Sequence, residues 1–161
     1  MNIALYVSEA DQVGGAEIAT LRLAERLSQR GCSVTVLTTV PLRRWLHSLL
    51  TIDYAKEFRL IRLPVWQRNR STSQAMMLAQ AAWAIPALMR RIHVLHVRGL
   101  SVETIRLAQL ARRMGIRTLC TPMASGDYGD AAKLPARMRR YIHRFDRIVA
   151  LTEPLRCEIL G

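Results

Sequence analysis

Short apolar runs rich in β-branched residues alternate along this chain with longer segments of helical periodicity. Residues 2–7 form the first apolar run, and residues 33–38 form the second. Between them, apolar residues recur at helical spacing from residue 15 to residue 30, and Gly31 follows in the position expected for a helix C-cap. A strand, a helix and a strand in this order predict a right-handed, parallel βαβ unit.

The same alternation continues to the end of the chain. It predicts further strands at 58–63, 94–97, 116–121 and 147–151, and helices at 41–50, 73–91, 101–114, 135–144 and after Thr152. Ser101 is the expected N-cap of its helix, and Gly115 is expected to end that helix. The pattern predicts a single domain over residues 1–161: a doubly wound, Rossmann-like parallel sheet of about six strands with helices on both faces.

The composition adds a strong basic bias to this picture. The chain has 24 Lys and Arg residues against 12 Asp and Glu, and only Lys56 and Lys133 are lysines. Arginine suits planar contacts with phosphate, so the bias indicates anionic partners, although a solvated basic surface explains it as well. Three cysteines without close pairing and no signal-peptide pattern lead us to expect a cytoplasmic protein. With no Asp-x-Asp and no His/Cys cluster, no metal is expected. No cofactor is expected either.

Ligands of such sheets bind beyond the carboxyl ends of the strands. There, Gly14 and Gly15 follow the first strand and open a helix, where free backbone N–H groups and the positive helix end favour an anion. A plain tight turn is the alternative. The patterns GxGxxG and GxxxxGK[ST] are absent, which argues against an ordinary NAD-dependent dehydrogenase and a P-loop ATPase.

Two residues near the end of the fourth strand need separate interpretations. Arg98 emerges at the strand end and is a candidate for binding a substrate anion, with a solvated arginine as the alternative. His96 lies within the strand and is predicted to be a packed residue rather than a catalytic one.

Several segments together resemble the family 4 glycosyltransferases of the GT-B fold. These are Gly14-Gly15-Ala16-Glu17 after the first strand, Val94-Leu95-His96-Val97-Arg98-Gly99, and Arg147-Ile148-Val149-Ala150-Leu151-Thr152-Glu153. The resemblance covers essentially the whole chain. It implies the acceptor-binding, N-terminal half of a retaining enzyme that transfers a sugar from a nucleotide-sugar donor, in cell-surface polysaccharide or glycolipid synthesis. A sugar or lipid-linked acceptor is implied as the second substrate.

The resemblance also implies roles for particular residues. Gly14 and Gly15 would approach the donor diphosphate, and the acceptor or active-site candidates are Glu17, Arg98, Gly99, Ser125, Gly126, Asp127 and Asp130. In the loop after the fifth strand, the aspartates would orient acceptor hydroxyls, unless they only stabilise a turn. The family often has His-x-His-Gly where this chain has His96-Val97-Arg98-Gly99, so no catalytic residue is assigned. The family's C-terminal donor domain, with its paired glutamates, is missing from this sequence, and we therefore expect the isolated chain to be inactive.

Two basic segments are candidates for contact with an anionic membrane on its cytoplasmic side. They combine cations with an interfacial aromatic residue and comprise Arg43, Arg44, Trp45, Arg137, Arg140 and Arg144. An ordinary solvated helix face is the alternative. Two other functions remain open: a basic nucleic-acid-binding module, which the scattered arginines and few aromatic residues make less fitting, and a non-catalytic partner of a separate donor-binding half.

Overall fold

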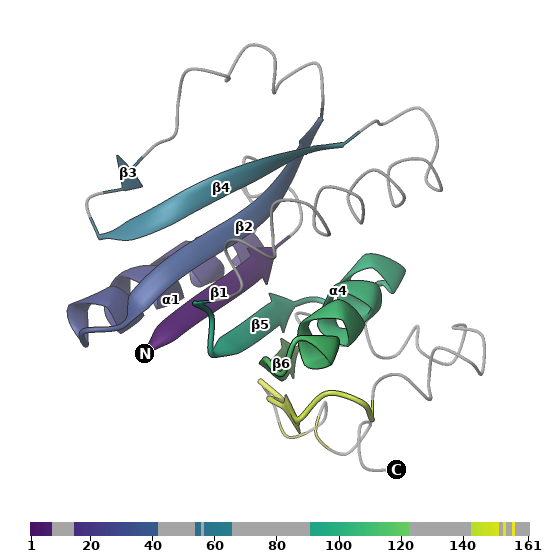
Figure 1. The fold of residues 1–161 in the computed structure, drawn as a ribbon. Coiled ribbons are helices and arrows are strands. Elements are labelled where there is room, and N and C mark those ends of the chain that lie inside the picture. Colours follow the sequence, from purple (N-terminus) through teal and green to yellow (C-terminus); the bar gives the residue numbers. More distant parts are fainter. Residues whose placement is uncertain are drawn as a thin grey trace.

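The structure is a computed structural model that describes residues 1–7, 15–41, 54–55, 57–65, 91–122 and 143–151, together with 153 and 156. One mixed β-sheet forms its centre. Its strands are β1 (Asn2–Val7), β2 (Ser33–Pro41), β3 (Tyr54–Ala55), β4 (Phe58–Val65), β5 (Val94–Arg98), β6 (Arg117–Thr121) and β7 (Arg147–Ile148). They lie in the order β3-β4-β2-β1-β5-β6-β7 (Figure 1). Six of them are parallel, and their order is that of the Rossmann fold, which confirms the predicted fold class.

The sheet departs from the sequence prediction at its two edges. At one edge, β3 pairs antiparallel with the first two residues of β4, an addition that the periodicity did not predict. At the other edge, β7 is shorter than the predicted strand 147–151, and both Val149 and Leu151 are exposed. β2 and β4 instead run further than predicted, and they stay paired as far as Pro41 and Val65.

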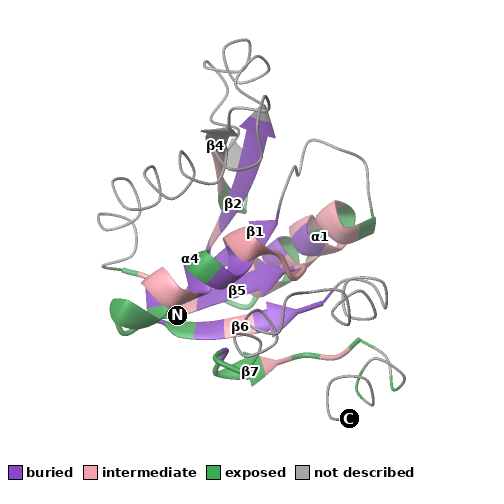
Figure 2. Ribbon diagram, turned by 90° about the vertical axis from the view of Figure 1, so that its right-hand side faces the viewer, coloured by how far each residue is buried: buried purple, intermediate pink, exposed green. Residues whose placement is uncertain are grey.

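The two described helices cover opposite faces of the sheet. Helix α1 (Gly15–Gln29) packs on the face that carries Leu5, Val7 and Val36, whereas α4 (Val102–Arg113) packs on the face that carries Tyr6 and Val97 (Figure 1). Helices on both faces were predicted. Figure 2 shows that the central strands between them are almost wholly buried. The predicted helices at 41–50 and 73–91, and most of the one at 135–144, lie outside the described residues.

The ends of both helices follow the predicted capping residues. Ser101 accepts a hydrogen bond from the backbone N–H of Thr104, whose hydroxyl in turn accepts one from the Ser101 N–H, so α4 starts with a complete capping box. Gly31 and Gly115 follow α1 and α4 with φ of 79° and 76°, a backbone conformation that favours glycine. These caps fix where β2 and β6 begin.

Candidate functional site

The topology places a candidate site at the carboxyl ends of β1 and β5. These strands are neighbours, but the chain continues from β1 to β2 on one side and from β5 to β6 on the other. Such a reversal of strand order opens the crevice in which Rossmann-type sheets bind ligands. Gly15, the first residue of α1, and Ser101, the N-cap of α4, follow these two strands in the chain.

A row of five residues on the face covered by α1 includes the last residues of β1, β5 and β6, and it lies three residues before the ends of β2 and β4. In the strand register, Val7 pairs with Thr38 and Thr38 pairs with Arg62, while Arg98 pairs with Thr121. Val7 and Arg98 are adjacent because they follow the registered pair Tyr6 and Val97. We call these five residues, Arg62, Thr38, Val7, Arg98 and Thr121, the rim row. Strands far apart in the sequence bring them together.

Arg98 is a buried cation at the centre of this site. Only 8% of the residue is exposed, and burial lowers the pKa of its guanidinium. The alternative of a solvated surface arginine is therefore wrong. A planar guanidinium is a group that forms charge-assisted hydrogen bonds with phosphates and carboxylates.

His96 lies two residues before Arg98 on the same face of the sheet and is likewise buried. Its Nε2 forms a 2.7 Å hydrogen bond with the Thr121 hydroxyl. Burial, and secondly the charge of Arg98, lower its pKa to about 4, so the imidazole is neutral at neutral pH. The prediction that His96 packs into the sheet is confirmed.

The turn after Arg98 needs its glycine. Gly99 has φ of 88°, and its N–H donates a 3.0 Å hydrogen bond to the carbonyl of Thr121. Thr121 is thus bonded through its hydroxyl to His96 and through its carbonyl to Gly99. Sequence reasoning did not single out Thr121, because only the register between β5 and β6 brings it beside these two residues.

Gly15 differs from Gly99 in that its backbone conformation does not require a glycine. It is exposed, its φ lies outside the left-handed region, and a Cβ built at this position would have no heavy atom within 4 Å. Backbone geometry therefore gives no reason for a glycine at position 15. Glu17, in the first turn of the same helix, is half-buried.

The remaining candidate residues are only partly covered by the structure. Arg144 is described and is exposed. The others, Gly14, Arg43, Arg44, Trp45, Ser125, Gly126, Asp127, Asp130, Arg137 and Arg140, lie outside the described residues. Within the described ranges, no group of three His, Cys, Asp or Glu residues could hold a metal ion, and no helix is long and apolar enough to span a membrane.

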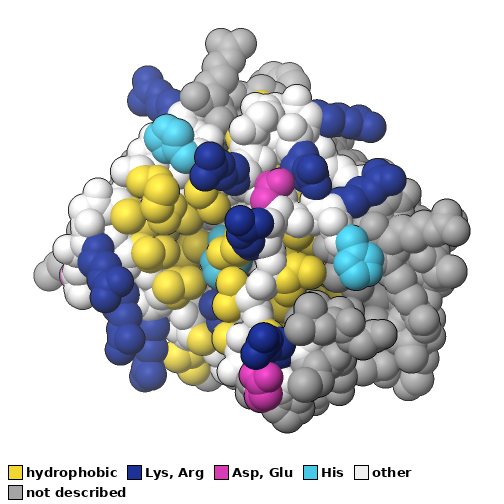
Figure 3. All heavy atoms as spheres, turned by 90° about the horizontal axis from the view of Figure 1, so that it is seen from below, with side chains coloured by type: hydrophobic (Ala, Val, Ile, Leu, Met, Phe, Trp, Pro, Cys, Tyr) yellow, Lys and Arg dark blue, Asp and Glu magenta, His cyan; other side chains and the backbone are white. Residues whose placement is uncertain are grey.

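The basic charge is dispersed on the face drawn in Figure 3. Arginine side chains there surround an apolar area and are not gathered into a single stripe. Exposed apolar residues of the described chain include Met114, Val149 and Leu151. A nucleic-acid footprint usually has its basic residues clustered on one face or along one helix.

Comparison with known proteins identifies the chain at the level of the family. A family model described as "Glycosyl transferase 4-like domain" matches residues 14–160. A search of curated proteins gave no match. Among solved structures, sucrose-phosphate synthase from Thermosynechococcus elongatus is similar, with a TM-score of 0.64 at 18% identity over 91% of this chain.

Two plant proteins share the same fold. A ugt transferase from Siraitia grosvenorii, solved in complex with UDP, matches 83% of this chain with a TM-score of 0.53 and 21% identity. UGT89C1 from Arabidopsis thaliana, also complexed with UDP, matches 99% with a TM-score of 0.60 and 13% identity. The chain spans 41%, 30% and 47% of these three structures, respectively.

Proposed function

Since the chain belongs to the glycosyl transferase 4-like domain family, we propose that it is the acceptor-binding, N-terminal half of a retaining glycosyltransferase that uses a nucleotide-sugar donor. The family match over residues 14–160 carries this proposal. The crevice supports it, because a buried arginine lies where a sheet of this topology binds ligands. The solved UDP complexes are consistent with a nucleotide-sugar donor.

Each half of the proposed site has its own substrate. Gly14 and Gly15 contact the donor diphosphate, whose charge is favoured by the N-terminus of α1. The open space beside Gly15 supports this, since it leaves room for close approach of a ligand. The acceptor lies near Glu17, Arg98 and Gly99 and the loop with Ser125, Gly126, Asp127 and Asp130. The nucleotide-sugar is a substrate, and no separate cofactor is proposed.

The proposed enzyme needs a second, donor-binding domain. The chain spans less than half of the similar solved structures, which supports a partner domain of comparable size. We place the reaction in cell-surface polysaccharide or glycolipid synthesis, at the cytoplasmic side of a membrane that the basic segments contact. The 161-residue chain alone should not turn over any nucleotide-sugar. Turnover above buffer blanks by the purified chain would contradict the two-domain proposal.

The donor contact is tested by Gly15→Val in the enzyme that joins this chain to its donor-binding half. A side chain at this position should block the diphosphate and abolish sugar transfer. The matched control is Arg22→Val, which introduces the same β-branched residue at an exposed position of α1. Thermal unfolding of both variants separates a blocked site from a destabilised fold. Wild-type transfer by folded Gly15→Val would contradict the proposed role of Gly15.

A further inference from the structure

Thr121, at the β6 end of the rim row, lies beside the turn that leaves β5. Its carbonyl accepts a 3.0 Å hydrogen bond from the N–H of Gly99, and the residue pairs with Arg98 in the strand register. Gly99 is half-buried, whereas Thr121 is only 1% exposed. Thr121 therefore acts on the crevice only through the turn at Gly99.

The side chain of Thr121 ties it to β5 a second time. His96 pairs with Leu119 in the strand register, so Thr121 lies diagonally across from His96 on the same face of the sheet. The Thr121 hydroxyl is 2.7 Å from the His96 Nε2, and only 7% of His96 is exposed. Loss of this bond is costly, because it would leave a ring nitrogen without its partner in a buried place.

The segment from Gly99 to Ser101 is held at both of its ends. At its start, the Gly99 N–H is bonded to Thr121. At its end, Ser101 and Thr104 exchange hydrogen bonds in the capping box of α4. Leu100, between them, packs against the buried cluster on the face covered by α4. The start of this segment therefore depends on β6, whereas its end depends on α4.

We propose that Thr121 is a positioning residue for the acceptor: its hydroxyl is fixed to β5 by His96, and its carbonyl sets the position of the turn at Gly99. This inference rests on the proposed function, in which the acceptor lies near Gly99. A site whose groups are fixed before the ligand arrives loses little entropy on binding, and small displacements of such groups weaken it strongly.

Hydrogen exchange in the 161-residue chain tests the link between the side chain and the turn. Thr121→Val removes the hydroxyl and should accelerate exchange of the Gly99 amide by about fivefold, the factor expected for one net hydrogen bond. Thr121→Ser restores a hydroxyl and should restore the rate. The Gly115 N–H, bonded to the Arg112 carbonyl at 3.0 Å, is the internal reference and should exchange as in the wild type. Equal acceleration at both glycines, or none at Gly99, would overturn the proposal.

Thr118→Val is the matched control. Thr118 is another buried threonine of β6, with 2% exposed, and its hydroxyl is bonded to Asp146 at 3.0 Å near the other end of the strand. Its loss should leave the Gly99 exchange rate unchanged, and an acceleration equal to that of Thr121→Val would overturn the proposal. If Thr121→Val does not fold, His96→Phe removes the other partner of the hydroxyl. Wild-type Gly99 exchange in folded His96→Phe would likewise overturn the proposal.

Kinetics test the effect on the acceptor in the enzyme that joins this chain to its donor-binding half, with a substrate pair that the wild type turns over. Thr121→Val should raise the acceptor KM by about fivefold and leave the donor KM unchanged, and Thr118→Val should change neither. An unchanged acceptor KM, or an equal rise for both substrates, would overturn the role of Thr121. Absence of sugar transfer by the wild type would overturn the proposed function, and the exchange rates would still decide whether Thr121 holds the turn.

Discussion

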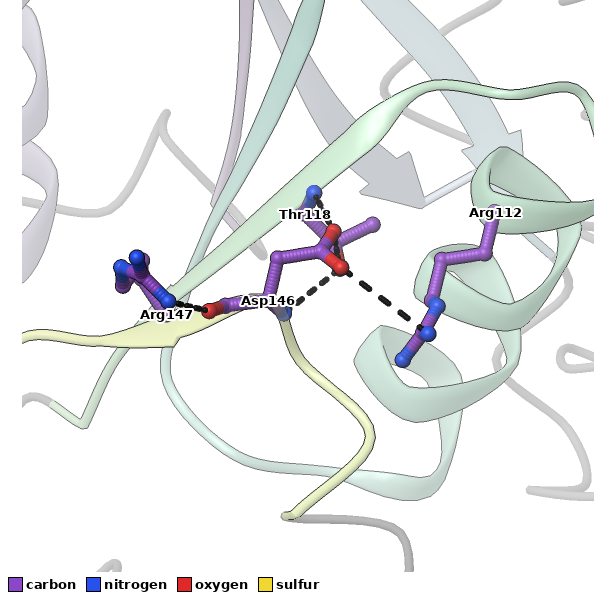
Figure 4. A network of polar contacts seen from close by, with 4 residues as sticks. All are labelled: Arg112, Thr118, Asp146 and Arg147. Carbon is purple, nitrogen blue, oxygen red and sulfur yellow. Dashed lines mark hydrogen bonds and ion pairs between the residues drawn. The ribbon is translucent and has the colours of Figure 1, made fainter.

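The carboxylate of Asp146 accepts two hydrogen bonds from Thr118, one from its backbone N–H at 2.7 Å and one from its hydroxyl at 3.0 Å (Figure 4). Arg112 of α4 lies 3.9 Å from the other carboxylate oxygen. These bonds lower the pKa of Asp146, the backbone bond most strongly. The residue joins the start of β7 to β6, although the strand itself is only two residues long.

Asp146→Ala should destabilise the domain by about 1–3 kcal/mol, because the buried N–H and hydroxyl of Thr118 lose their partner. The loss should be smaller for Asp146→Asn, which keeps one acceptor oxygen. The control is Glu153→Ala, which removes the exposed ion pair between Glu153 and Arg156 and should cost less than about 0.5 kcal/mol. Urea unfolding at neutral pH measures all three. Similar losses for Asp146→Ala and Glu153→Ala would contradict this role.

The stability of the domain should fall as the pH drops from 6.5 to 4, because the pKa of His96 is lowered to about 4 in the folded state. Below pH 6.5 the unfolded chain binds a proton at this residue while the folded chain does not. The loss should approach about 3 kcal/mol near the lower limit. Asp146 reduces stability only at lower pH. Its pKa is lowered in the folded state, and its carboxylate favours the folded state only while it is ionised. Urea unfolding across this range measures the free energy of unfolding, which should depend less steeply on pH in His96→Phe than in the wild type. An equally steep dependence in both would contradict the role of His96 in this loss of stability.

Two glycines of the site should respond oppositely to alanine. Gly99→Ala should destabilise by roughly 1–2 kcal/mol because φ is 88° at this position. Gly15→Ala should be neutral or stabilising by up to about 1 kcal/mol, because the added methyl group meets open space at the start of a helix. Thermal unfolding compares the two variants. A loss of stability in Gly15→Ala equal to that of Gly99→Ala would show that Gly15 has a structural role.

The chain should bind reversibly to anionic vesicles through its basic segments. Each Lys or Arg near an anionic surface contributes about 1 kcal/mol, so a combined Arg43→Gln, Arg44→Gln and Trp45→Ala variant should bind clearly less. Arg22→Gln with Arg26→Gln removes charge from exposed positions of α1 and is the control. Vesicle sedimentation at low salt measures binding. Equal binding to neutral and anionic vesicles would contradict the electrostatic contact.

Much of the fold was predictable because its signals are local. Apolar periodicity distinguished strands from helices, and Gly31, Ser101 and Gly115 marked the helix ends. The two-residue strand β3 has no periodicity to detect, and its pairing depends on the neighbouring β4. The apolar residues Val149 and Leu151 were interpreted as strand, but pairing ends at Cys120 and Ile148. Apolar character alone does not supply a partner strand.

The sequence by itself determined the longer strands, the helices α1 and α4, their caps, and the presence of glycines and an arginine at strand ends. Each of these depends on a residue and its near neighbours. The tertiary structure decided that Arg98 is buried, that Val7 and Thr121 flank it, and that His96 is a buried, neutral imidazole bonded to Thr121. The reason is that strand order and register depend on pairings between residues far apart in the chain. Burial and pKa follow only once those pairings are made.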